Sequence, residues 1–420
     1  MLDKERMNRN LLIDDVVVFD GEHHVPDERR CVVVTDGRIS DVRPTGAPGE
    51  TSRPDVEIIQ GEGMTLMPGL IDAHFHCNSP FLDVSSADAL APSHLAHYAG
   101  RHLEDVLRRG FTTVRDAGGA DRGLVRAIED GLIDAPRLLI SGKALSQTGG
   151  HGDLRRGVSI CGCEGYRGSI SCVVDGPEGI RRAVREELRQ GAQQIKIFTS
   201  GGMLSPTDPV WMDQFTDDEI RAAVEEAARW RTYVMAHSLT ANSARRCAQL
   251  GVRSIEHGFG IDAPTARLVA DSGCYVTATL CIVHSLLDED IQVPEASREK
   301  LRRFGDDVFE AVRHCHDAGI KVGLGTDLLG RLHGREAQEL VLREKVSGAL
   351  ETLRSATSVN AELLNMKGEI GTVRRGAIAD LLLVKGDPVR DISLLTRPDE
   401  TMLLVIKDGR IVRDRRKTCQ

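Results

Sequence analysis

Residues 67–76 read MPGLIDAHFH, a short apolar stretch that ends in two histidines separated by one residue. Residues two apart in a β-strand point to the same face, so His74 and His76 would enter one space. Imidazole is a ligand that suits zinc and related divalent ions. We therefore interpret this stretch as the first strand of the domain that carries the chemistry.

Seven further candidate strands follow, and helical patterns lie between them. The eight candidate strands end near His76, Arg115, Ser141, Phe198, His237, Glu256, Leu280 and Asp327. Helical patterns cover 178–190, 217–230 and 241–250, and Gly191 and Gly251 stand just past two of them, where helix C-caps are expected. Eight strands alternating with helices predict a parallel barrel or a doubly wound sheet.

Polar residues at the strand ends decide between these two folds. The fifth strand ends VMAHS with His237, the sixth SIEHG with His257 and the eighth GLGTD with Asp327. A lone histidine near a strand end is more often structural, but these recur at equivalent positions of a repeated unit. A closed barrel brings all its strand ends to one face, and an open sheet does not. The sequence therefore predicts an α/β fold with a (β/α)8 TIM barrel.

Lys196 lies in QIKIFTSGG, where Ile195 and Ile197 flank it on either side. The period of two would place both isoleucines against helices and Lys196 inside the barrel. A buried ammonium is costly and its pKa falls. A neutral amine can capture carbon dioxide as a carbamate, whose two oxygens could bridge two divalent cations. The alternative is a lysine paired with an inward-facing acid.

The two ends of the chain resemble each other. Short apolar strands surround Asp36-Gly37 near the start, and similar strands surround Gly386-Asp387 and Asp408-Gly409 near the end. Asp-Gly between apolar runs is typical of hairpins. Neither end has enough strands to bury a core alone. We predict a small β-sandwich domain from residues 1–66 and 368–420, and the barrel from 67–367.

Composition excludes several classes of protein. The net charge of −9 with no long basic run disfavours nucleic-acid partners. No apolar stretch is long enough to span a bilayer, and the charged first residues do not read as a secretory signal, so we expect a cytoplasmic protein without a membrane partner. Cys161, Cys163 and Cys172 are the only cysteine cluster, and reduced loop thiols fit them better than a separate zinc site.

Together these motifs resemble the amidohydrolase superfamily over nearly the whole chain. FTTVRDAGG, ALSQTGGHGD, QIKIFTSGG and GLGTDLLG are closer still to its branch of Xaa-Pro dipeptidase-like enzymes, related carboxypeptidases and ochratoxin amidohydrolases. The resemblance implies two divalent metals, with zinc favoured, and a large symmetric homo-oligomer such as an octamer. The metal ligands that it implies are His74, His76, carboxylated Lys196, His237, His257 and Asp327.

The resemblance also implies roles in the reaction. His151, in TGGHGD, corresponds to a histidine used beside the scissile carbonyl, and Asp327 to the residue that moves a proton between the attacking water and the leaving amine. A small-molecule amide, such as a dipeptide or an N-acyl amino acid, is the expected substrate. Carbamates and aryl amides remain open, because Leu239 and His284 stand where the branch tends to carry tyrosine. His284 or Arg331 could then pair with a substrate carboxylate.

Three rival interpretations remain. A mononuclear deaminase or imidazolone-type hydrolase uses similar ligands without a bridging lysine. A silent barrel scaffold would have lost a ligand, and none is lost here. A solute-binding protein would need an export signal, which we do not find in these residues.

Overall fold

A computed structural model describes residues 10–47, 56–155, 167–205, 208–305 and 307–416. Eight parallel strands form the barrel, and they end where the sequence predicts. They are β6 (Leu70–Phe75), β7 (Phe111–Asp116), β8 (Arg137–Leu139), β11 (Ile195–Phe198), β12 (Val234–Ser238), β13 (Ser254–His257), β14 (Tyr275–Ala278) and β15 (Val322–Leu324). The predicted (β/α)8 barrel is confirmed.

Hydrogen bonds close the barrel at its two seams. Between β8 and β11, the Gln193 N–H donates to the Ile140 carbonyl at 2.9 Å. Between β15 and β6, the Asp327 N–H donates to the His74 carbonyl at 2.8 Å. The Asn360 side-chain amide donates to carbonyls of both β6 and β15, at 2.7 and 2.8 Å. Two short strands, β9 (Ala144–Ser146) and β10 (Ser171–Val173), follow β8 in the chain; β9 pairs with β11, and β10 pairs with β9.

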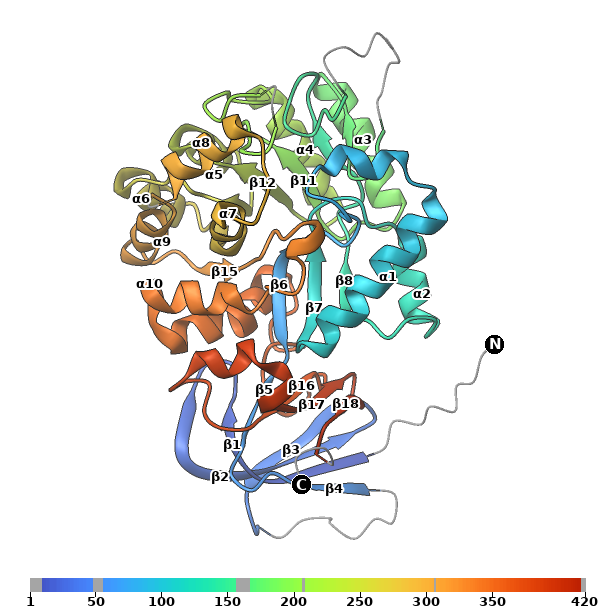
Figure 1. Ribbon diagram of the computed structural model, residues 1–420, viewed down its shortest axis with the longest axis vertical. Helices are drawn as coiled ribbons and strands as arrows, with labels where there is room; N and C mark the ends of the chain where they lie inside the picture. The colour runs from blue at the N-terminus through green and yellow to red at the C-terminus, as the bar shows by residue number, and fades with distance from the viewer. Residues whose placement is uncertain (1–9, 48–55, 156–166, 206–207, 306, 417–420) are drawn as a thin grey trace.

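Helices surround the barrel (Figure 1). They are α1 (Pro92–Arg108), α2 (Arg122–Glu129), α3 (Pro177–Arg189), α4 (Asp217–Arg229), α5 (Ala241–Gln249), α6 (Ala263–Asp271), α7 (Leu280–Leu287), α8 (Glu295–Phe304), α9 (Asp307–Asp317), α10 (Gln338–Arg354) and the short α11 (Asn360–Leu363) and α12 (Pro398–Thr401). The three predicted helices correspond to α3, α4 and α5. Gly191 and Gly251 follow α3 and α5 with φ of 96° and 85°, as helix C-caps require.

Strands from both ends of the chain build one eight-stranded sheet. They are β1 (Asn10–Phe19), β2 (His24–Thr35), β3 (Arg38–Pro44), β4 (Val56–Gln60), β5 (Thr65–Pro68), β16 (Leu381–Val384), β17 (Met402–Lys407) and β18 (Arg410–Asp414). Antiparallel pairing of β5 with β16 joins the two ends. Ile13 and Val32 share a core with Leu383 and Leu404, so residues from both ends of the chain are needed to complete this core.

The sheet domain lies at one end of the barrel (Figure 1). The chain passes from β5 in the sheet to β6 in the barrel across Gly69, so the carboxyl end of β6 points away from the sheet. Phe111 and Leu107 of the barrel share a core with Leu382 and Met402 of the sheet. In the described residues, no helix is long and apolar enough to cross a membrane.

Candidate active site

Three of the predicted ligands converge at the carboxyl end of the barrel. His74, His257 and Asp327 each offer a donor atom within 4.8 Å of the others. Asp327 Oδ1 lies 3.1 Å from His76 Nε2 and 3.5 Å from His74 Nε2. Within the described part of the chain, the buried Nε2 of His74 has no hydrogen-bond partner. A buried imidazole nitrogen that faces a carboxylate and lacks a partner fits a metal-ligand position.

His237 joins this group from β12. Its ring centroid lies 4.7 Å from that of His257, which in turn lies 4.7 Å from the ring of His74. The Nε2 of His237 donates to the Gly201 carbonyl at 3.3 Å, which leaves Nδ1 with the lone pair that a metal requires. His74, His76 and His257 therefore surround Asp327, and His237 lies beside His257.

Two of these residues hold backbone conformations that are rare for side chains with a Cβ. His257 has a φ of 70° and Asp327 a φ of 56°, both in the left-handed region. Regular alternation along β13 already turns Glu256 into the barrel, so His257 would point outward in an ideal strand. The left-handed turn brings His257 into the site as well. Strain of this kind concentrates at functional positions.

Lys196 lies inside the barrel, as the alternation predicts. Its side chain is almost fully buried, and its Nζ lies 5.7 Å from the centre of the Phe198 ring. Ile195 and Ile197 face outward and pack in a core that includes Val184 of α3. Burial lowers the pKa of Lys196 to about 8, although the negative charges of Glu256 and Asp327 oppose this shift.

The electrostatics suit a divalent cation. Burial lowers the pKa of His74 and His237 well below the ordinary value, and that of His257 to about 3. Burial opposes ionisation of Asp327, but the hydrogen bond from His76 and the electrostatic interactions with His257, His76 and Lys196 together outweigh it, and the pKa of Asp327 is lowered. Neutral imidazoles beside an anionic carboxylate are the donor set that zinc and related ions take.

His151 is held against the site by three contacts. Its ring stacks on His237 with centroids 4.6 Å apart, and its Nδ1 lies 3.1 Å from Oδ2 of the buried Asp208. Its backbone N–H donates to Gln214 at 2.9 Å. Because a carboxylate only accepts, Asp208 holds the proton on Nδ1 and leaves Nε2 free of this bond. The Cα of Gly202 faces the ring, and a Cβ there would lie 1.8 Å from His151.

The three predicted pocket residues lie in different surroundings. Leu239 is buried in the barrel core, and its backbone N–H donates to Ser200 at 2.9 Å. His284 is exposed on α7 and lines a groove of about 540 Å³ with residues of α10, none of which is a predicted metal ligand. Arg331 is exposed and donates to the Asp290 carbonyl. The roles of all three in substrate binding stay predictions.

Several residues in contact with the site escaped the sequence analysis. Glu256 accepts from His74, Arg115 pairs with Glu256, and Asp208 orients His151. Alternation along SIEHG would have placed Glu256 inside the barrel beside the histidine that was recognised. No periodic pattern in the sequence marks Asp208, because this residue lies in an irregular loop. Of the cysteine cluster, Cys172 is buried in β10, and Cys161 and Cys163 lie outside the described residues.

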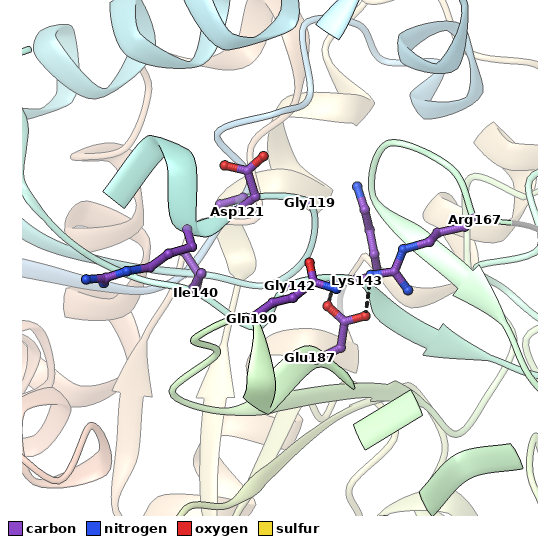
Figure 2. Close-up of a pocket in the computed structure, with 10 residues that line it drawn as sticks. Gly119, Asp121, Ile140, Gly142, Lys143, Arg167, Glu187 and Gln190 are labelled. Carbon is purple, nitrogen blue, oxygen red and sulfur yellow. Dashed lines mark hydrogen bonds and ion pairs between the residues drawn. The ribbon is translucent and has the colours of Figure 1, made fainter. Parts of the chain in front are cut away.

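A second cavity lies apart from the predicted ligands (Figure 2). Its volume is about 20 Å³, enough for about one water molecule. Lys143, Arg167 and Glu187 line it, and Glu187 accepts hydrogen bonds from the Arg167 side chain and the Lys143 N–H. The cavity is too small for an organic substrate.

Comparisons with known proteins agree with this fold. Residues 65–412 match the model of the amidohydrolase family. The chain is 32% identical over 364 residues to ochratoxinase of Aspergillus niger, which covers 82% of this chain and 75% of ochratoxinase. A prolidase crystallised with N-methylphosphonate-L-proline is similar with a TM-score of 0.91 and 41% identity, covering 97% of this chain and 100% of that one. A Xaa-Pro dipeptidase with bound methionine gives a TM-score of 0.85 and 30% identity, covering 96% and 100%.

Proposed function

The chain belongs to the amidohydrolase family and is a hydrolase that acts on C–N bonds, and from this premise we propose that it is a binuclear metalloenzyme cleaving dipeptides and N-acyl amino acids. The observation that carries the proposal is the convergence of His74, His257 and Asp327 at the open end of the barrel. Enzymes with this fold place their chemistry at that end.

The donor set fits two divalent ions. The residues that would hold them are His74, His76, Lys196, His237, His257 and Asp327. Such ions, when bound, polarise a carbonyl and bring the pKa of a water close to neutrality. Zinc suits the imidazole-rich set best, and manganese or cobalt could replace it.

Lys196 would contribute as a carbamate. Its lowered pKa leaves a substantial fraction of neutral amine near pH 8. The neutral Nζ attacks the carbon of carbon dioxide, forms the N–C bond and releases one proton, which leaves an anion with two oxygens. This anion could bridge two cations, and it replaces a buried positive charge by a negative one. That exchange favours cation binding.

Asp327 and His151 would act on the substrate. Asp327 takes the proton of the attacking water and delivers it to the leaving nitrogen, which is a poor leaving group without a proton. His151 donates from Nε2 to the carbonyl oxygen as negative charge develops there, when the ring carries a proton on both nitrogens. The Asp208 carboxylate, which faces Nδ1 at 3.1 Å, holds the ring in the orientation for this contact.

The proposed substrate class rests on the relatives. The similar structures hold a phosphonate analogue of a proline dipeptide and an amino acid, which are ligands with a carboxylate. Leu239 gives the second candidate function. Its aliphatic side chain supplies no hydrogen bond to a substrate carboxylate, whereas the dipeptidase-like branch tends to carry tyrosine at this position. The absence of this hydrogen bond would favour amides or carbamates of uncharged compounds. We place dipeptides and N-acyl amino acids first because of the 41% identity to the prolidase.

Metal analysis of the purified protein tests the metal centre. We expect close to two divalent ions per chain in the wild type. Lys196→Ala should lose at least one of them and nearly all activity, and short carboxylates such as formate should restore part of it. Lys385→Ala, at an exposed lysine that follows β16 in the terminal sheet, is the control and should keep both. Full metal content and activity in Lys196→Ala would contradict the bridging role.

A paired substrate series tests the substrate class. Each N-acyl amino acid or dipeptide is compared with the analogue whose free carboxylate is blocked as a methyl ester or an amide. The acyl group and the scissile amide bond are the same in both compounds. We expect the compounds with a free carboxylate to be hydrolysed faster, because a site built to pair a charge rejects an analogue that lacks it. Equal or faster cleavage of the uncharged analogues would assign the enzyme to neutral amides or carbamates.

A further inference from the structure

A buried ion pair lies against the metal-facing histidine His74. Glu256 and Arg115 are both fully buried inside the barrel, and the Arg115 guanidinium lies 3.0 Å from the carboxylate. The Arg115 side chain also donates to the Ala73 carbonyl at 2.5 Å and to the Thr277 hydroxyl at 3.3 Å. The Ser254 hydroxyl donates to Glu256 as well. The carboxylate is therefore held from several sides.

Glu256 also contacts His74, a predicted metal ligand. Its Oε2 lies 2.6 Å from Nδ1 of His74. An ionised carboxylate only accepts hydrogen bonds, so Nδ1 carries the proton and Nε2 carries the lone pair. That Nε2 faces Asp327 Oδ1 at 3.5 Å and, among the described residues, has no hydrogen-bond partner.

We propose that Glu256 and Arg115 form a positioning pair that fixes His74 as an Nε2 metal ligand and thereby sets the metal affinity of the site. The proposal rests on the metal centre of the proposed function. Carboxylates that hold the second nitrogen of a ligand histidine fix its tautomer and ring orientation and raise its basicity. Arg115 holds the carboxylate in place and compensates its charge, because an isolated buried charge is unfavourable.

The contacts of a second buried glutamate show what a purely structural pair looks like. Glu187 also accepts from an arginine, Arg167, but its other bond comes from the Lys143 backbone N–H (Figure 2). It contacts no predicted ligand. Glu187→Gln is therefore the matched control for Glu256→Gln, since each removes a buried carboxylate that pairs with an arginine.

Zinc affinity, measured by competition with a chelator, tests the proposal. Glu256→Gln should bind Zn²⁺ about 10- to 100-fold more weakly than the wild type, as is typical when such a partner is lost. Glu187→Gln should keep wild-type affinity even if it unfolds at a lower temperature. Equal affinity in wild type and Glu256→Gln would overturn the proposal.

A double variant separates positioning from stability. Arg115→Met with Glu256→Leu removes both charges, and such replacements of buried pairs often recover stability. We expect the thermal unfolding midpoint to return toward the wild type while Zn²⁺ binding stays weak. Recovery of both would mean that the pair serves the fold alone, and would overturn the proposal.

The wild type itself provides a measurement that needs no variant. A crystal structure of the zinc-loaded protein should show zinc on Nε2 of His74 and Glu256 on Nδ1. Coordination through Nδ1 would overturn the positioning role even if no variant folds. Failure of the wild type to bind zinc would instead contradict the proposed metal centre, so the two failures are distinguishable.

Discussion

At the scale of single residues, Asp327 combines close contacts to several histidines with a strained backbone conformation. It lies within 4 Å of three histidines, and its φ of 56° is kept although aspartate adopts that region at a cost. A residue held in this way is suited to one geometry. In the proposed reaction, that geometry would let the carboxylate exchange a proton with water and with the leaving group.

Asp327→Asn removes the proton carrier and keeps the shape of the side chain. We expect kcat to fall about a hundredfold to ten-thousandfold, the usual loss for a general acid or base, and further if a metal is lost. Steady-state kinetics with metal analysis of the same samples measure both effects. A variant with wild-type kcat would show that another group moves the proton.

His151 and Asp208 form the second residue-scale prediction. His151→Ala should lower kcat and kcat/KM together by about a hundredfold, with little change in metal content, as for loss of an oxyanion donor. Asp208→Asn keeps the ring but weakens its orientation, so we expect a smaller loss in the same two constants. A change in KM alone would assign His151 to substrate binding that is equal in the ground state and the transition state.

At the scale of elements, the segment that follows β11 determines where His151 lies. Gly201 accepts from His237, and the Gly202 N–H donates to Asp208 at 2.9 Å. Gly202 also lies against the His151 ring, where no Cβ fits. The glycines of QIKIFTSGG thus allow backbone and imidazole to approach closely.

Gly202→Ala should displace His151 without unfolding the protein. The added Cβ would lie 1.8 Å from an atom of the ring, so the ring would have to shift. A shift of about 1 Å in a positioned group can cost about a hundredfold in rate, so kcat should fall toward the level of His151→Ala. The control is Gly100→Ala in α1, where the nearest side-chain atom is 3.5 Å away and activity should not change. Wild-type kcat in Gly202→Ala would contradict this account.

At the scale of the whole molecule, a charge network joins the barrel to the terminal sheet. Arg137 at the start of β8 donates to Asp408 at 2.5 Å and to Asp380 at 3.3 Å. The Asp380 side chain is only 2% exposed, so its carboxylate needs a charged partner such as Arg137. The network lies at the opposite end of the barrel from the predicted ligands, because β8 begins there.

Arg137→Met should therefore weaken the joint between the domains and leave the chemistry intact. Loss of a charged partner from a buried carboxylate costs about 1–3 kcal/mol of unfolding free energy. We expect a lower midpoint of thermal or urea unfolding and an unchanged kcat at a temperature where the variant is folded. A large fall in kcat without a change in the unfolding midpoint would show that the sheet domain influences the site directly.

Much of this molecule could be predicted from local patterns. Alternation places Lys196 inside and its two isoleucines outside, and Asp-Gly pairs mark the hairpins of both ends at Asp36 and Asp408. Equivalent polar residues at successive strand ends predicted a closed barrel, and the structure confirms it. Period, turn chemistry and repetition are properties of neighbouring residues, so the amino-acid sequence alone reveals them.

Contacts between distant segments depend on the tertiary structure. Glu256 meets His74 across 182 residues of chain, and Asp208 meets His151 from an irregular loop without a periodic signal. The outward placement of His284 depends on how α7 packs against α10, which no spacing in CIVHSLLD encodes. The left-handed turn at His257 likewise breaks the alternation on which strand prediction relies. The sequence by itself therefore determined the barrel, the paired termini and the candidate ligand set. Only the tertiary structure decided which buried charges hold those ligands, because burial and pairing depend on segments that meet only in the folded chain.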